Sequence, residues 1–221
     1  ENAALSHRYF GSQVGAHVAA VINRHLKLKN LRTILDLSCG KGDIIASILP
    51  YLKHGQSIYG TDFSDRNIKH TDNRFKENPS FQKAHLLRDY PSPFSEGFFN
   101  LIIITEVVEH LNDIDLDLLL TEASRLLSSG GTIFVTTPNN EDLDADKVMC
   151  PDCGCVYHRW QHVRKWTPES LKQKMEHYSF QTTLVQQIAW GAPFKKRLAL
   201  KFAVKMNLLI PGGLLYFGQK I

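Results

Sequence analysis

The chain is predicted to fold as an α/β domain around a mostly parallel, doubly wound sheet, and three observations predict this class. The apolar run at 34–37 leads into a turn rich in small residues, and a helical pattern of apolar residues follows. Segments with strand and helix character then alternate along the chain, as in sheets with helices on both faces. Residues 99–105 are almost continuously apolar, which is typical of a strand buried on both faces.

The individual elements follow from periodicity and turn residues. Residues 7–26 predict an amphipathic helix that covers the sheet, with Phe10 and Val14 on its apolar side. The glycine pair at 130–131 predicts the end of a helix, and Pro168 fits the first position of the next one. Strands are predicted at about 32–37, 57–62, 84–88, 99–105, 132–137, 181–188 and 214–219, and the other helices at about 44–49, 65–76 and 116–127.

Length and composition indicate one globular domain. The 221 residues are 43% apolar, which is enough for a single sizeable core spanning 1–221. The net charge of +4 is small, so nucleic acid is not the expected partner. No apolar run reaches 18 residues, so we expect no transmembrane helix. We also expect no signal peptide at 1–5, although a chain that begins without Met can lack upstream residues.

Two segments are predicted to be insertions that shape an acceptor site. The first is about 141–166 and the second is about 191–213. Both follow strand ends, and in open α/β sheets ligands bind outside the carboxyl ends of the strands. The basic and apolar stretch 194–210 is also a candidate for peripheral membrane contact or for a lid, with a docked helix that has a solvated basic face as the alternative.

The glycine turn predicts a bound nucleoside. Gly40 and Gly42 would need a third glycine at position 45 to complete the dinucleotide fingerprint, and that residue is Ile45, so a nicotinamide cofactor is disfavoured. Asp62 ends the next predicted strand about twenty residues later, where a carboxylate can accept ribose hydroxyls. Asp89 follows the third predicted strand. A turn that binds nothing and a different nucleotide remain alternatives.

The order of these motifs over about residues 30–140 resembles the class I S-adenosylmethionine-dependent methyltransferases. The resemblance implies a Rossmann-like sheet of seven strands with an antiparallel last strand, and S-adenosylmethionine as the methyl donor. It also implies positions for the donor. Around its methionine end would lie Asp36, Ser38, Cys39, Gly40 and Gly42. Around its ribose and adenine would lie Asp62, Phe63, Asp89 and Tyr90. Near its sulfonium would lie Thr105 and Glu106. Helix capping is the alternative role for the strand-end acids, and a core position is the alternative for the Phe63 ring.

The candidates for a catalytic base are Glu106, Glu109 and His110. A base matters only when the acceptor is a hydroxyl or an ammonium group, because the sulfonium is already a good leaving group. The Glu-His-Leu element is common in the superfamily that the chain resembles, and a purely structural turn is the alternative role.

A cysteine–histidine cluster predicts a metal site. Cys150 and Cys153 resemble the Cys-Pro-x-Cys-Gly knuckle of zinc ribbons. His158 and His162 are four residues apart, so on a helix they would share a face. Together these four residues would form a closed structural zinc site, with Cys155 as a substitute ligand. The clustered cysteines do not resemble a secreted disulfide framework, so we expect a cytoplasmic protein; simple burial of free cysteines is the alternative to metal binding.

The residues Glu106, Glu109, His110 and His162 also resemble, in part, the metal tetrad of the small-RNA 3′-terminal 2′-O-methyltransferases. In that family two glutamates and two histidines hold magnesium or manganese at the terminal ribose.

Taken as a whole, the sequence predicts a methyltransferase that acts on oxygen or nitrogen of a small-molecule or sugar-containing acceptor. The alternatives are an enzyme acting on an RNA 3′ end and a regulatory protein that binds the donor without turnover.

Overall fold

The computed structural model describes residues 14–190 and 211–221. Its strands are β1 (Thr33–Leu37), β2 (Ser57–Asp62), β3 (Phe81–Leu86), β4 (Phe99–Thr105), β5 (Leu127–Pro138), β6 (Lys147–Met149), β7 (Val156–His158), β8 (Phe180–Ile188) and β9 (Gly213–Lys220). Its α-helices are α2 (Gly15–Leu26), α3 (Asp43–Ile48), α4 (Asp65–Phe75), α5 (Asp113–Leu126) and α6 (Pro168–His177), and short 3₁₀ turns occur at Leu28–Asn30 and Leu49–Tyr51.

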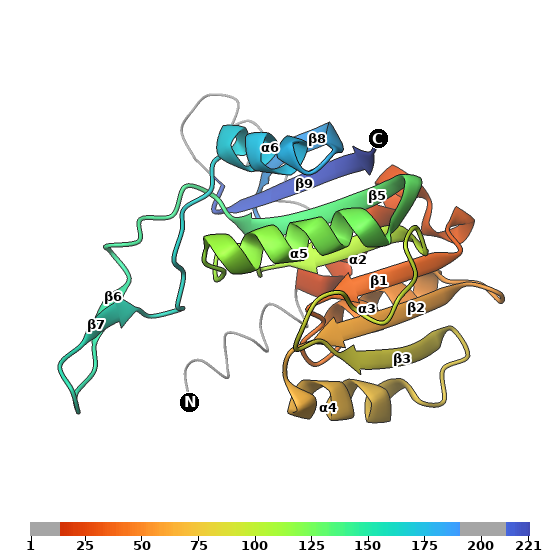
Figure 1. Cartoon of the computed structure of the whole chain (residues 1–221), viewed down its shortest axis with the longest axis horizontal. Helices are drawn as coiled ribbons and strands as arrows, with labels where there is room; N and C mark the ends of the chain where they lie inside the picture. The colour runs from red at the N-terminus through yellow and green to blue at the C-terminus, as the bar shows by residue number, and fades with distance from the viewer. Residues whose placement is uncertain (1–13, 191–210) are drawn as a thin grey trace.

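Seven strands form one sheet in the order β3-β2-β1-β4-β5-β9-β8 (Figure 1). The strands from β3 to β5 are parallel to their neighbours. The last strand, β9, lies between β5 and β8 and is antiparallel to both. The predicted doubly wound sheet with an antiparallel last strand is therefore confirmed. Strands β6 and β7 pair only with each other and form a hairpin that projects from the body of the domain.

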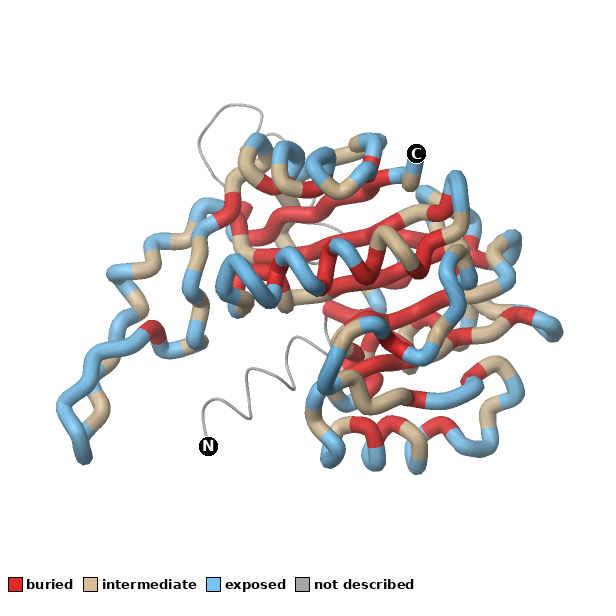
Figure 2. The backbone as a smooth tube through the Cα atoms, in the orientation of Figure 1, coloured by how far each residue is buried: buried red, intermediate tan, exposed pale blue. Residues whose placement is uncertain are grey.

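Helices cover both faces of the sheet, because the buried strands present apolar side chains on both sides. Ile103 of β4 packs in the core with α2, α3 and α4, whereas its neighbours Ile102 and Ile104 pack in the core with α5 and α6. Figure 2 shows the central strands as a buried layer with α5 lying across it. This arrangement explains why the continuous apolar run of β4 predicted its position without error.

Phe99 begins β4 and is fully buried, whereas the adjacent Phe98 is 38% exposed. The Phe99 ring meets the rings of Phe94 at 4.9 Å and Tyr59 at 5.6 Å. We expect Phe99→Ala to lower the free energy of unfolding by about 3–5 kcal/mol, since it leaves a cavity in the core. Phe98→Ala is the matched control and should cost roughly 1 kcal/mol. Urea unfolding measures both, and equal costs would contradict this account of the core.

Three elements differ from their predicted bounds, and one predicted element is only partly described. Helix α5 begins at Asp113 rather than near 116, because the Asn112 side chain caps it by accepting a hydrogen bond from the Asp115 amide at 3.0 Å. Strand β3 begins at Phe81 rather than near 84, because the Phe81 ring packs against Phe75 of α4 at 5.4 Å. Strand β5 begins directly after α5 and runs through the glycine pair, where Gly130 has φ 72° and the pairing with β4 shifts register. Of the helix predicted over 7–26, residues 7–13 lie outside the described residues.

Candidate active site

The site lies where the order of the strands reverses. Strand β1 is followed in the sheet by β2 and β3 on one side and by β4 and β5 on the other. Asp36 of β1 pairs with Ile103 of β4, so the turn 38–42 and the pair 105–106 leave neighbouring strand ends. Open α/β sheets bind ligands in the crevice at such a reversal. Ser38 and Glu106, the first residues beyond β1 and β4, have φ values of 75° and 53°, in the left-handed region that non-glycine residues avoid.

The two glycines of the turn serve different purposes. Gly40 has φ 55°, and a Cβ added to it would meet nothing within 4 Å, so its backbone borders open space that a ligand can occupy. Gly42 has φ 77°, and a Cβ there would lie 2.6 Å from the Phe75 ring. Thr71 holds the turn by donating a hydrogen bond to the Gly40 carbonyl oxygen at 3.1 Å. Gly42 is therefore required so that the turn can pack against α4, and Gly40 leaves the backbone accessible to a ligand.

This difference predicts unequal costs for two matched substitutions. We expect Gly42→Ala to destabilise the protein by about 2–4 kcal/mol, because left-handed strain adds to overpacking against α4. Gly40→Ala should cost roughly 1–2 kcal/mol from strain alone, but should weaken donor binding. Thermal unfolding and donor titration separate these effects. Equal stability losses would show that the contact with Phe75 is relieved without cost.

Asp62 connects the end of β2 to the glycine turn. Its Oδ2 accepts a hydrogen bond from the Gly40 amide at 2.9 Å. Its Oδ1 accepts hydrogen bonds from the Ser64 amide at 2.8 Å and from Asn67 Nδ2 at 3.1 Å. These bonds fix the carboxylate at the position expected for a ribose contact.

Asp36 is a buried acid without a partner. Its side chain is 1% exposed, and neither carboxylate oxygen has a hydrogen-bond partner among the described residues. Burial, followed by the nearby charges of Asp62 and Asp43, raises the pKa of Asp36 to about 8. An unpaired carboxyl group beside other acids fits a cationic ligand, and S-adenosylmethionine carries positive charge on its sulfonium and on its ammonium group.

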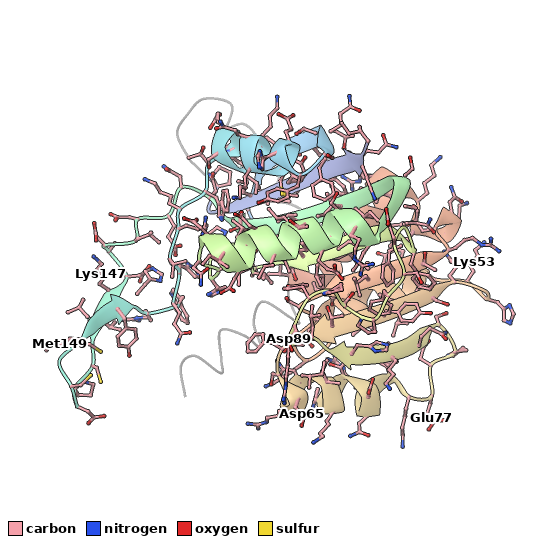
Figure 3. The ribbon with its side chains drawn as sticks, viewed as in Figure 1. Lys53, Asp65, Glu77, Asp89, Lys147 and Met149 are labelled. Carbon is pink, nitrogen blue, oxygen red and sulfur yellow. The ribbon has the colours of Figure 1, made fainter. Side chains whose placement is uncertain are left out.

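The predicted adenine side is open to solvent. The Phe63 side chain is 77% exposed, so its ring is available to a ligand. Asp89 is exposed and lies at the same end of the sheet as Asp65, the first residue of α4 (Figure 3). A cavity of about 430 Å³ is lined by Leu86, Leu87, Arg88, Asp89, Pro91 and Pro93. Tyr90 is half-buried and packs with the apolar residues on the α5 side of the sheet.

Two glutamates follow β4: Glu106 is half-buried and Glu109 is fully buried. Thr136 donates a hydrogen bond to Glu106 Oε1 at 2.8 Å, and Thr137 donates one to Glu109 Oε2 at 3.0 Å. Burial and the charge of Glu141 raise the pKa of Glu106 to about 7, against the opposing effect of the Thr136 hydrogen bond. Burial and the charge of Glu106 raise the pKa of Glu109 well above its usual range. Glu106 therefore exchanges its proton near neutral pH, as a general base must.

Histidines from the segment after β5 complete this cluster. The ring centroids of His110 and His162 are 4.7 Å apart, and those of His158 and His162 are 4.8 Å apart. His162 Nδ1 and Glu141 Oε2 are 2.5 Å apart. The ligand atoms of Glu109, His110 and His162 all lie within 4.8 Å of one another, a spacing that could hold a metal ion.

Sequence reasoning missed Glu141. It follows Asn139 and Asn140 in a stretch that contains several acids, and no spacing marks it out. Only the fold shows that the connection after β5 returns past the end of β4, where the Val163 amide donates a hydrogen bond to the Glu109 carbonyl oxygen at 2.9 Å.

The structure divides the predicted zinc ligands into two groups. Cys150 and Cys153 lie with Cys155, and their sulfur atoms are within 4.8 Å of one another. His158 and His162 lie with Glu141 instead. The predicted helix carrying both histidines does not form; His158 ends β7, and a turn with Gln161 at φ 62° brings His162 back to it. Among the described residues the four predicted ligands thus do not form one group.

The doubly wound sheet, its antiparallel β9 and the glycine turn at the strand reversal define the fold of the class I S-adenosylmethionine-dependent methyltransferases. The chain belongs to the methyltransferase-domain family, whose model matches residues 10–185. The implied cofactor is S-adenosylmethionine, and the residues that the structure places at the switch point fit it: an open glycine backbone, a fixed Asp62 and an unpaired Asp36.

The sequence relatives of the chain include ubiquinone biosynthesis O-methyltransferases. The chain is 33% identical over 117 residues to the ubiquinone biosynthesis O-methyltransferase of Pelagibacter ubique, covering 51% of this chain and 44% of that protein. It is 30% identical to the corresponding protein of Chelativorans sp., covering 75% of this chain and 60% of that protein. The chain thus spans about half the length of these relatives.

Solved structures share the fold at low identity. A SAM-dependent methyltransferase from Archaeoglobus fulgidus matches with a TM-score of 0.62 at 19% identity, over 93% of this chain and 94% of that one. The [4+2]-cyclase SpnF matches with a TM-score of 0.67 at 14% identity, over 93% of this chain and 81% of that one. Because the second is a cyclase, the fold alone does not determine the reaction.

None of the helices in 14–190 and 211–221 is both long enough and apolar enough to span a membrane.

Proposed function

We propose that the chain transfers a methyl group from S-adenosylmethionine to a hydroxyl oxygen of a small-molecule acceptor. The observation that carries this proposal is the position of the Glu106–Glu109 carboxyl pair. The pair lies directly beyond the end of β4. In the sheet β4 is the neighbour of β1, the strand that contains Asp36 and leads into the glycine turn. Oxygen, rather than nitrogen, is favoured by the names of the relatives.

The roles of the residues follow from this placement. Bound S-adenosylmethionine supplies a methyl group activated on a sulfonium. Asp36 faces the cationic end of the donor, and Asp62 holds the ribose hydroxyls. Glu106 or Glu109 accepts the proton of the acceptor hydroxyl as the new C–O bond forms and the C–S bond breaks. A base whose pKa lies near the working pH is the most effective for this step. Positioning of the acceptor in line with the methyl group supplies much of the remaining rate.

A methyl-transfer experiment tests the proposal. Purified protein is incubated with donor carrying a radiolabelled methyl group and with cell extract, and the products are separated into RNA, protein, lipid and small-molecule fractions. We expect label in the small-molecule or lipid fraction. Donor binding in calorimetry without label in any fraction would instead support a regulatory protein that binds the donor but does not turn over.

One observation favours a second candidate, methylation of an RNA 3′ end. Glu109, His110 and His162, three of the four residues that resemble the RNA-specific metal tetrad, have ligand atoms within 4.8 Å of one another. Imidazole and carboxylate ligands suit a divalent cation, which would lower the pKa of a bound hydroxyl. Label in RNA that depends on added manganese would favour this candidate over a small-molecule acceptor.

The location of the protein in the cell belongs to the same proposal. The crowded cysteines at 150–155, free in the structure, suit a reducing compartment, so we propose the cytoplasm.

Segment 194–210, the candidate for membrane contact, lies outside the described residues. Flotation with anionic vesicles, with and without the charge-reversing triple substitution R197E/K201E/K205E, tests that contact; no flotation of the native chain would exclude it.

A further inference from the structure

Three of the four cysteines gather at the end of the β6–β7 hairpin. Cys150 is half-buried, and Cys153 and Cys155 are exposed. The Gly154 amide donates a hydrogen bond to the Cys150 carbonyl oxygen at 2.9 Å, and Gly154 has φ 71°, so the chain turns back sharply between Cys150 and Cys155. The Cys150 amide also donates to the Cys155 carbonyl oxygen at 2.8 Å, which places these two residues side by side.

The three sulfur atoms have the spacing of metal ligands. All lie within 4.8 Å of one another, and the Sγ atoms of Cys153 and Cys155 are 3.2 Å apart. Tetrahedral coordination with Zn–S distances of about 2.3 Å requires sulfur atoms about 3.8 Å apart. Small side-chain rotations would therefore place all three thiolates on one ion.

The hairpin itself lacks another source of stability. It has three residue pairs, and its apolar side chains are exposed: Met149 by 67%, Val156 by 62% and Tyr157 by 44%. Met149, the neighbour of Cys150, lies far from the sheet in Figure 3. An isolated two-stranded hairpin is marginally stable in water, and a bound metal is a common way to hold so small a unit.

The histidines lie too far along the hairpin to share this ion. His158 pairs with Lys147, three residues along β7 from Cys155. Three residues of extended strand put about 10 Å of backbone between them. Among the described residues, the groups of ligand atoms within 4.8 Å of one another hold either the cysteines or the histidines, and none combines the two. The histidines belong to the site at the base of the hairpin, and the cysteines form a separate site at its tip.

We propose that Cys150, Cys153 and Cys155 bind one zinc ion per chain, with the fourth coordination position open to solvent. Thiolate ligands in a tetrahedral arrangement favour zinc over magnesium or manganese. The ion fixes the tip of the hairpin and so restrains the segment that carries His158 and His162 to the candidate active site. The zinc site does not depend on methyl transfer.

Elemental analysis of protein purified under reducing conditions without chelator tests the proposal. We expect one zinc per chain in the native protein, and at least a tenfold loss in C150S, C153S and C155S. The pair H158A/H162A should keep its zinc, and so should C39A, the matched control at the fourth cysteine, which is buried in the core. Because the three ligands lie at the tip of an exposed hairpin, their variants should keep the global unfolding temperature of the native chain.

X-ray absorption at the zinc edge should show three sulfur neighbours and one lighter neighbour. Zinc retained in C155S but lost in H158A/H162A would overturn the proposal in favour of a cysteine–histidine set. The absence of zinc from the native chain, or binding of another transition metal in its place, would overturn it as well.

Discussion

Replacing Asp36 by Asn should both stabilise the ligand-free protein at pH 8 and weaken donor binding by about 100-fold. The stabilisation is expected because the buried carboxyl group has no partner and a pKa raised to about 8. Each pKa unit corresponds to about 1.4 kcal/mol, so the shift from 3.8 to about 8 sets an upper limit of roughly 6 kcal/mol. We expect about 2–3 kcal/mol, because the site relaxes when the charge is removed.

The direction of the pH dependence follows from the raised pKa. Between pH 4 and 8 the folded protein holds a proton on Asp36 that the unfolded chain releases, so the native protein loses stability relative to D36N as the pH rises through this range. A cationic donor favours the ionised carboxylate, so binding should release a proton and should become tighter as the pH rises toward 8. In D36N the contribution of Asp36 to both dependences should be lost, while the contribution of Glu106 and Glu109 to the pH dependence of stability remains.

Chemical unfolding from pH 5 to 8.5, with donor calorimetry in two buffers of different ionisation enthalpy, measures both effects. Asp43→Asn is the matched control. Asp43 begins α3, on the other side of the glycine turn from Asp36, but it is partly exposed, and its Oδ1 lies 2.7 Å from Arg74 Nη1. Its substitution should change stability by less than about 1 kcal/mol. If D36N binds the donor as tightly as the native chain, Asp36 does not face the donor.

The sheet could be predicted from the sequence because its signals are local. Apolar runs at β2 and β4, followed by acids and small residues, give the strand ends within a residue or two. The start of strand β5 was harder to predict. A glycine pair is usually a signal for the end of a helix, but here it lies in the irregular first part of the strand, which is held by the pairing of Leu127 with Phe99. That pairing joins residues far apart in the chain and leaves no local pattern.

In the candidate site, too, local sequence signals predicted some residues, whereas contacts between distant parts of the chain determined the others. The acids at strand ends could be placed because parallel strands carry their carboxyl ends to one edge of the sheet. The sequence also identified His162, but it could not choose between the cysteines and Glu109 as its neighbours. The choice depends on the path of the connection after β5, which brings Glu141 and both histidines beneath the hairpin and leaves the cysteines at its tip. Side-chain burial decided the protonation of Glu106, and burial is a property of the whole fold.

Replacing Glu109 by Gln should remove most of the methyl transfer while it leaves folding and donor binding intact. Burial and the charge of Glu106 raise the pKa of Glu109, which favours the protonated form in the ligand-free protein. Gln has the shape of the protonated acid and can keep the contact with Thr137, so we expect no loss of stability. Loss of a positioned base costs about 10²–10⁴-fold in rate. The native rate should rise as the pH increases through about 7, because Glu106 must lose its proton to act as a base.

Single-turnover methyl transfer with saturating donor measures the chemical step, and calorimetry checks the affinity for the donor. Glu169→Gln is the matched control, because Glu169 is an exposed carboxylate in the first turn of α6. Glu106→Gln should flatten the pH profile, since it removes the group whose pKa is about 7. A Glu109→Gln variant with native rates would mean that Glu109 is not the base and only shapes the turn after β4. The pH profile of Glu106→Gln then decides whether Glu106 acts as the base, because a purely structural residue would leave that profile unchanged.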